Sequence, residues 1–123
     1  MTLTIDTSGQ GLAMVLKDYQ EEALRYIWEK KGEGASSRDV WSQVNKRLKN
    51  RSISRASIIN FLNEMVDESV LNYTEITGKG GHRRIYSIKL DEGQFKQYVA
   101  ETVLKNLMRD FPAETKQAVK NIK

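Results

Sequence analysis

The fold is decided by residues 36–89, which read SSRDVWSQVNKRLKNRSISRASIINFLNEMVDESVLNYTEITGKGGHRRIYSIK. Two apolar helical patterns come first, and a basic linker joins them. A short alternating segment, a glycine turn with basic residues and a second alternating segment follow. Two helices and then a basic hairpin is the order of elements in a winged helix-turn-helix. The stretch therefore predicts an α+β fold with a β-hairpin wing.

Both helices of this stretch combine an N-cap with an apolar stripe. Ser36 and Ser37 can each cap the first helix, which we expect to end at Asn50. Ser54 can cap the second helix, which we expect to run to about Glu68. The stripes repeat every three or four residues and are formed by Val40, Trp41, Val44 and Leu48 in the first helix and by Ile58, Phe61, Leu62, Met65 and Val66 in the second.

A hairpin is predicted directly after the second helix. Residues 71–76 and 84–88 each alternate between apolar and polar positions, as strands with one buried face do. The glycine-rich residues 78–81 supply the turn between them. Because Lys79, Arg83 and Arg84 lie in or beside this turn, the tip of the wing is basic.

We divide the chain into three parts. Residues 1–12, rich in Thr, Ser and Gly, are expected to form a flexible arm. Residues 13–90 are expected to form the winged-helix domain, whose remaining core helix starts near Ala13 and stops at Gly32. Residues 91–123 are expected to form a C-terminal dimerisation helix, which Pro112 ends, and a tail that frays.

Composition excludes several classes of protein. The 123 residues leave room for one core, and the absence of cysteine excludes a disulfide framework and a thiolate metal site. The net charge of +4 is a mild basic excess. No stretch approaches the roughly 20 apolar residues of a membrane span, and the first ten residues lack the features of a signal peptide. We therefore expect a soluble, cytoplasmic protein with no membrane partner.

The sequence does not favour an enzyme. His82 is the only histidine, and the chain has no second imidazole and no cysteine to complete a metal site or a catalytic triad with it. The nearby glycines do not follow a strand and open a helix, as a dinucleotide-binding loop requires. We expect no catalytic residue, no metal and no cofactor.

Two groups of basic residues point to double-stranded DNA. Residues 46–55, which we call the basic linker, contain five cations and no acid, and residues 79–84 contain three more cations and no acid. In a winged helix the first group lies at the start of the recognition helix and the second at the wing, so both can meet one duplex.

Within these groups, some side chains suit base readout and others suit phosphate contacts. Arg can bind guanine and Asn can bind adenine, so Arg55 and Asn60 are the candidates for base readout. Ser54 can equally serve as the helix cap, and of the two wing arginines we favour Arg83 for facing DNA. The complete set of candidate DNA-binding residues is Arg51, Ser54, Arg55, Ser57, Asn60, Lys79, His82, Arg83 and Arg84.

The C-terminal helix carries an apolar stripe that suits an interface between copies. The preceding helices and hairpin already form a closed core, so this stripe remains exposed in a monomer unless the helix folds back on its own domain. A two-fold dimer would set two recognition helices about one DNA turn apart. The candidate dimerisation residues are Phe95, Tyr98, Val99, Val103, Leu104, Leu107, Met108 and Phe111.

Three stretches of the chain together resemble a known family. They are YQEEALRYIWEKKGEGASSRDVW (19–41), SRASIINFLNEMVDESVL (54–71) and GKGGHRRIYSI (78–88). Ile27 and Trp28 before a glycine-rich break, and a third helix of the form Ser-x-x-x-Ile-x-x-x-Leu-x-x-Met, resemble the penicillinase-repressor family of winged-helix regulators. The resemblance covers about residues 17–95, and the multiple-antibiotic-resistance regulators share much of it.

The resemblance implies a homodimeric repressor that binds a palindromic operator through the third helix and the wing. It implies that Arg83 or Arg84 meets the DNA backbone and that the groove is faced by Ser54, Arg55, Ser57 and Asn60. The third helix of the family commonly begins with aromatic and threonine residues where this chain has Arg55 and Ala56, so an operator sequence does not transfer. The cysteine motifs of the copper-responsive members are absent, which excludes that response.

The family's dimerisation segment often has more than one helix, whereas this chain is expected to have one helix and a tail. Two other functions stay open, namely a winged-helix protein-interaction module in a larger assembly and a general DNA binder of low specificity. A pocket for a small aromatic effector is also possible between the first and last helices, although packing is the plainer account of the aromatic residues there, which are Tyr19, Tyr26, Trp28 and Tyr98.

Overall fold

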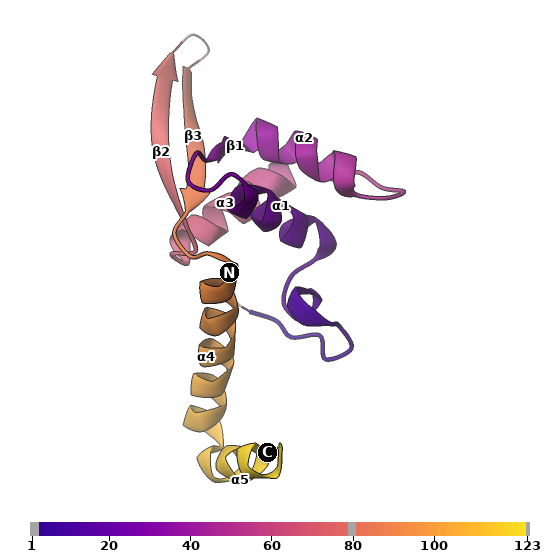
Figure 1. Cartoon of the computed structure of the whole chain (residues 1–123), viewed down its shortest axis with the longest axis vertical. Helices are drawn as coiled ribbons and strands as arrows, with labels where there is room; N and C mark the ends of the chain where they lie inside the picture. The colour runs from indigo at the N-terminus through magenta and orange to yellow at the C-terminus, as the bar shows by residue number, and fades with distance from the viewer. Residues whose placement is uncertain (1–2, 79–80, 123) are drawn as a thin grey trace. The chain divides into compact units, whose positions relative to one another are not determined.

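The structure is a computed structural model that describes residues 3–78 and 81–122. The chain divides into two compact units, Met1–Glu92 and Gly93–Lys123, which we describe separately. Figure 1 shows the helices and strands of both units.

The first unit is an α+β winged helix-turn-helix, as the sequence predicts. Three helices form its core, and a hairpin of two long strands forms the wing. In chain order its elements are the 3₁₀ helix η1 (Gly11–Met14), α1 (Asp18–Glu29), β1 (Ala35–Ser36), α2 (Ser37–Arg47), α3 (Arg55–Asp67), β2 (Leu71–Gly78) and β3 (Gly81–Ile88).

The core of this unit lies where the three helices pack together. The predicted apolar stripes supply it, although Trp41, Leu48 and Val66 are only half-buried. Burial of these side chains removes apolar surface from water and is the main stabilising term of the fold. The fully buried side chains of the three helices are Ala23, Leu24, Ile27, Val40, Val44, Ile58, Phe61, Leu62 and Met65.

Of the two serines predicted as caps of α2, Ser36 is the N-cap and Ser37 is the first residue of the helix, and Ser54 caps α3 as predicted. The Ser36 hydroxyl accepts a hydrogen bond from the Asp39 N–H (3.2 Å), and the Asp39 carboxylate accepts one from the Ser36 N–H (3.4 Å). The Ser54 hydroxyl accepts a hydrogen bond from the Ser57 N–H (3.1 Å). These bonds satisfy backbone donors that have no partner within the helix and so fix where α2 and α3 begin.

The prediction that the first core helix starts near Ala13 is wrong, because α1 begins at Asp18. The preceding residues form η1 instead, and the Asp6 N–H donates to the Met14 carbonyl (2.7 Å). Lys17 has an extended backbone, and its N–H donates to the Gln20 side chain (2.9 Å), which caps α1. The apolar periodicity continues through this break because Leu12 and Leu16 are also buried.

The sheet contains a strand that the sequence did not predict. Its order is β1-β3-β2, and β1 pairs antiparallel with β3 through Ala35 and Tyr86. Gly34 permits this approach, because a Cβ at that position would lie 2.7 Å from the Tyr86 carbonyl oxygen and the backbone there has a φ of +79°. The connection between α1 and α2 is thereby joined to the wing.

The C-terminal region differs from the expected helix and tail. It holds α4 (Glu92–Asp110) and a further helix, α5 (Pro112–Ile122), where we expected the chain to fray. Pro112 is the first residue of α5, a position where the missing N–H and the fixed φ of proline suit a helix. The buried Thr115 hydroxyl donates to the carbonyls of Phe111 (2.8 Å) and Leu107 (3.2 Å), which joins the two helices.

Candidate nucleic-acid interface

The start of α3 is exposed and polar. Arg55 and Asn60 are exposed and Ser57 is half-buried, while Ile58 and Phe61 on the other face are buried. The helix therefore presents its predicted polar residues to solvent while its apolar face holds it on the core. The Ser54 hydroxyl also donates to the Ser57 hydroxyl (2.9 Å). Ser54 is therefore the N-cap of α3 in this structure.

The linker before α3 is held in place by two side chains of α2. The Asn45 side-chain oxygen accepts a hydrogen bond from the Ile53 N–H (2.7 Å), and the Trp41 indole N–H donates to the Ile53 carbonyl (2.9 Å). These bonds fix the backbone one residue before the Ser54 cap. This role of Asn45 cannot be predicted from the sequence, because its partner lies eight residues later in an irregular segment.

A pocket of about 380 Å³ lies between the start of α2, the first residue of α3 and the tip of the wing. Arg38, Arg55 and Arg83, all exposed, contribute to its wall, one from each of these elements. We call it the arginine pocket, and its described lining is Ser36, Ser37, Arg38, Arg55, Ile76, Gly78, Gly81, His82 and Arg83. Arg38 is not among the residues that the sequence predicts, because only the pairing of β1 with β3 brings the start of α2 to the wing.

The two wing arginines have different surroundings. The Arg84 guanidinium lies over the Tyr73 ring, 4.0 Å from its centroid, and donates to the Asn63 side-chain oxygen (3.0 Å). The Tyr86 hydroxyl donates to the same oxygen (2.6 Å). Arg84 thus fastens the wing to α3, while Arg83 borders the arginine pocket.

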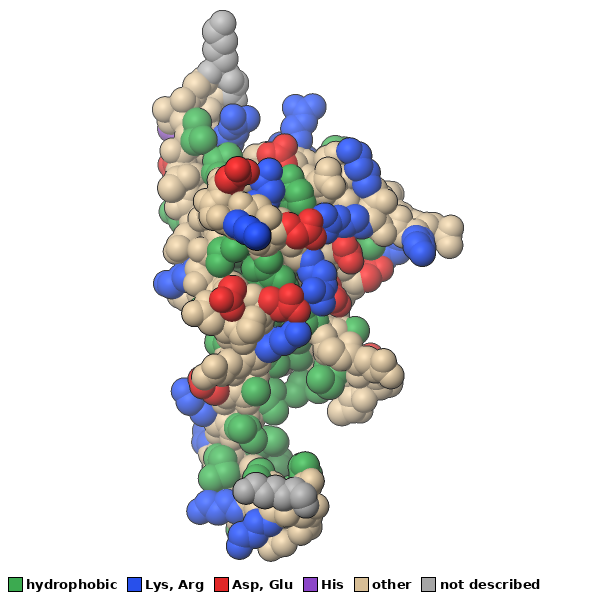
Figure 2. All heavy atoms as spheres, viewed as in Figure 1, with side chains coloured by type: hydrophobic (Ala, Val, Ile, Leu, Met, Phe, Trp, Pro, Cys, Tyr) green, Lys and Arg blue, Asp and Glu red, His purple; other side chains and the backbone are tan. Residues whose placement is uncertain are grey.

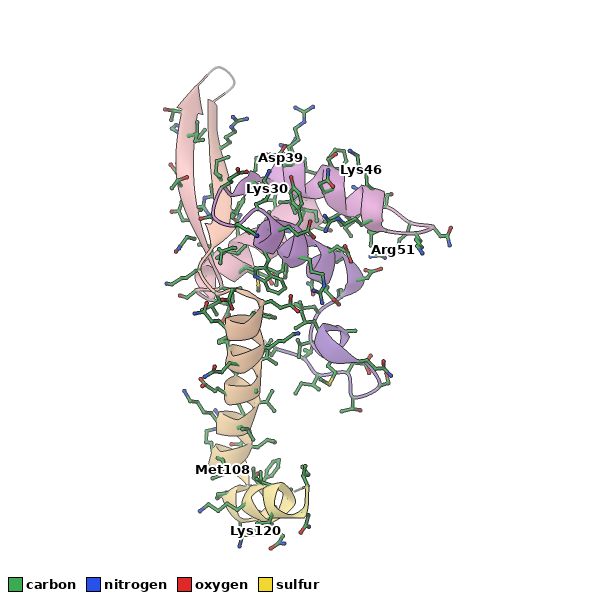
Figure 3. All side chains as sticks on the ribbon, in the orientation of Figure 1. Lys30, Asp39, Lys46, Arg51, Met108 and Lys120 are labelled. Atoms are coloured by element: carbon green, nitrogen blue, oxygen red, sulfur yellow. The ribbon has the colours of Figure 1, made fainter. Side chains whose placement is uncertain are left out.

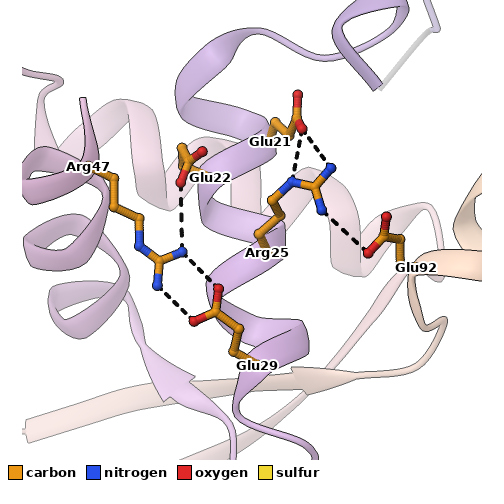
Figure 4. A network of polar contacts seen from close by, with 6 residues as sticks. All are labelled: Glu21, Glu22, Arg25, Glu29, Arg47 and Glu92. Atoms are coloured by element: carbon orange, nitrogen blue, oxygen red, sulfur yellow. Dashed lines mark hydrogen bonds and ion pairs between the residues drawn. The ribbon is translucent and has the colours of Figure 1, made fainter. Parts of the chain in front are cut away.

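In the folded chain, part of the positive charge of the basic linker is neutralised by acidic side chains. Arg47 forms ion pairs with Glu29 (2.8 Å) and Glu22 (3.7 Å) of α1, as Figure 4 shows. Arg51 pairs with Asp18, also of α1 (2.8 Å). The hydrogen bond from Arg47 holds the pKa of the Glu29 carboxyl below its usual value. Two of the predicted cations are therefore partly neutralised by acids that lie earlier in the chain.

The remaining charges of the first unit are mixed. Figure 2 shows acidic and basic side chains interspersed over the face that it displays. Figure 3 places Lys46 on α2 and Arg51 on the loop that follows, in line with the division of the basic linker between a helix and a loop. Lys79, the other predicted wing cation, lies outside the described residues.

The described residues contain no group of three or more His, Cys, Asp or Glu side chains that could hold a metal ion. Over the same part of the chain, no helix has the length and apolar character needed to cross a membrane.

A profile of the penicillinase repressor family matches residues 16–122. The chain belongs to this family. Its members are transcriptional repressors and not enzymes, so this chain is a DNA-binding transcriptional repressor. No match was found among curated proteins. The matched region extends through α4 and α5, beyond the residues 17–95 on which the resemblance in the sequence rests.

In this penicillinase repressor family member, three of the four aromatic residues considered for an effector pocket have partners within the first unit. The Tyr19 and Phe61 rings meet edge to face with centroids 6.3 Å apart. The Trp28 indole N–H donates to the Leu90 carbonyl (3.1 Å), and the Arg47 guanidinium lies over the Tyr26 ring. These contacts favour packing as the role of these side chains.

The second unit of the repressor leaves apolar side chains exposed. Leu104, Met108 and Phe111 of the predicted dimerisation set are between 38% and 48% exposed. Phe95 is buried, and its ring lies 6.1 Å from that of Tyr98. The rest of the set is half-buried and consists of Tyr98, Val99, Val103 and Leu107. On α5, Val119 and Ile122 add to the exposed apolar surface.

Proposed function

We propose that this repressor binds its operator as a homodimer, with the start of α3 in the major groove and the wing on the adjacent backbone. The observation that carries the proposal is the polar, exposed start of α3 beside the cations of the wing. Helix-turn-helix proteins read bases with the N-terminal residues of the second helix of the motif. In this assignment Arg55 and Asn60 read base edges, while Ser57, His82 and Arg83 approach the backbone.

The homodimer is supported by the exposed apolar residues of α4 and α5. A two-fold axis would bury Leu104, Met108 and Phe111 of each copy and would present two α3 helices to one duplex. The operator would then be an inverted repeat whose half-sites are about one turn apart, because protein and DNA share the two-fold symmetry.

The test is selection from a random duplex library with the full chain at moderate salt, followed by sequencing of the retained DNA. We expect enrichment of an inverted repeat with half-sites about one turn apart. Retention without a motif would replace the proposal with a general DNA binder. A lack of retention would favour the protein-interaction module instead, since a protein partner gives no counterion release on DNA.

Arg55→Ala tests the base-reading assignment on the selected operator. Loss of a bidentate base contact should cost about 1–3 kcal/mol and relax the preference at one operator position. The control is Lys105→Ala, which removes a cation from an exposed position on α4. An equal loss on all duplexes would make Arg55 a phosphate contact, and no loss beyond the control would remove it from the interface.

A further inference from the structure

We propose that the arginine pocket holds a phosphate group of the DNA backbone, and that its ligands are Arg38 of α2 and Arg83 of the wing, while Arg55 at the edge of the pocket keeps its base-reading role. The inference rests on the proposed function and adds to it a third element, α2, that contacts the duplex. The sequence predicted neither Arg38 as a DNA-binding residue nor α2 as an element that contacts DNA.

The charges of the pocket favour the binding of an anion. Its described lining holds three arginines and no carboxylate. Guanidinium groups stay protonated at all physiological pH values, so their mutual repulsion persists unless an anion neutralises it. Asp39 is nearby in sequence, but its carboxylate accepts the Ser36 N–H in the capping box.

Other described arginines of the chain have partners, which sets these three apart. Arg25, Arg47, Arg51 and Arg109 each pair with a carboxylate within 4.0 Å. Arg84 stacks on Tyr73 and donates to Asn63. Among the described residues, the three arginines of the pocket form no ion pair. They are therefore available to a ligand from outside the chain.

The shape and chemistry of the pocket suit a phosphodiester. Arginine is the side chain that best matches the oxygens of a phosphate, because it can donate two parallel hydrogen bonds. Ile76 is 43% exposed, pairs across the hairpin with Arg83 and offers an apolar surface for a deoxyribose. The Ser37 hydroxyl and the N-terminal end of α2 add a donor and a favourable helix dipole.

The position of the pocket makes a backbone phosphate a better occupant than a free anion. Arg55 borders it and is also the first residue of the helix that we assign to the major groove. In the proposed docking, a strand that leaves this groove would pass between α3 and the wing, which are two of the walls of the pocket. One phosphate in the pocket would therefore set the register of α3 on its operator.

The experiment uses the full chain and measures the affinity for the selected operator and for a random duplex over a range of salt concentrations. Arg38→Gln should weaken binding to both duplexes by the same factor and leave the base preference unchanged. It should also reduce the slope of log K against log salt by about 0.9, the value for one phosphate contact. Lys105→Gln is the matched control, because it removes the same charge from an exposed position in the second unit.

The outcomes separate the two proposals. If the wild-type chain binds its operator and Arg38→Gln has the same salt slope as the control, the proposal that the arginine pocket binds a backbone phosphate is wrong, while the proposed function stands. If the wild-type chain binds no duplex, both fail. Thermal melts with and without inorganic phosphate test whether a free anion is the occupant of the pocket. Stabilisation of the wild type but not of Arg38→Gln, with unchanged slopes on DNA, would overturn the assignment to backbone phosphate. Arg38→Lys, which keeps the charge, should restore most of the slope.

Discussion

At the scale of single residues, Asn63 is the point where the wing meets α3. Its side-chain oxygen accepts hydrogen bonds from both Arg84 and Tyr86. Tyr86 is buried, and its burial raises the pKa of the phenol above the ordinary value of 10.0. The network therefore couples the ionisation of one wing residue to the stability of the fold.

We predict that Tyr86→Phe makes the stability of the chain less sensitive to alkaline pH. Because the folded chain favours the neutral phenol, its contribution to stability is present below the pKa of the unfolded chain and is lost as pH rises through the folded pKa. Urea unfolding measured from pH 8 to about 11 should show a steeper decline for wild type than for Tyr86→Phe. Tyr73→Phe is the control, and equal slopes for wild type and Tyr86→Phe would contradict the prediction.

The sequence favoured Arg83 over Arg84 for facing DNA, because successive side chains of a strand point to opposite faces and alternation is a local property. It did not predict the partners of Arg84, since Asn63 lies 21 residues earlier. The same limit applies to Arg51, whose partner Asp18 is 33 residues away. Side-chain partners of this kind depend on how the elements pack, and a stretch of sequence does not contain that information.

At the scale of elements, the start of α3 depends on α2 through the bonds of Asn45 and Trp41 to Ile53. We predict that Asn45→Ala lowers the free energy of unfolding by about 1–3 kcal/mol, because it leaves the part-buried Ile53 N–H without its acceptor. Chemical denaturation measures the change. Lys46→Ala, at an exposed neighbouring position on the same helix, should stay within about 0.5 kcal/mol of wild type. Equal effects of the two substitutions would show that the bond to Ile53 contributes nothing.

The elements differ in how far the sequence predicted them. The caps and stripes of α2 and α3 are local signals, and the structure confirms both. β1 has two residues, and its partner strand lies some fifty residues later, so no periodicity reveals it. For α5, Pro112 predicts the end of a helix, although proline also suits the first turn of the next one. The hydrogen bonds by which Thr115 joins α4 and α5 depend on how the two helices pack, so the sequence pattern does not predict them.

At the scale of the whole molecule, the exposed apolar side chains of α4 make the oligomeric state testable. We predict that Leu104→Glu shifts the chain from dimer to monomer at micromolar concentrations, because it places a carboxylate in an apolar interface. Sedimentation velocity measures the shift, and operator affinity should fall with it. Asn106→Glu makes the same change of charge at an exposed position two residues further along. A monomeric wild type, or a Leu104→Glu variant that remains dimeric, would refute this interface.

The ion pairs of Arg47 and Arg51 with α1 bear on how quickly the repressor finds its target in a chromosome. A genome offers on the order of 10⁶–10⁹ competing sites, and attraction to them depends on the cations that the protein can bring to phosphate. We expect each arginine that pairs with an acid of α1 to contribute less to non-specific binding and so to shorten the time spent on irrelevant sequence. More copies of the protein then remain free to search, and fewer are needed in each cell to keep a single operator occupied.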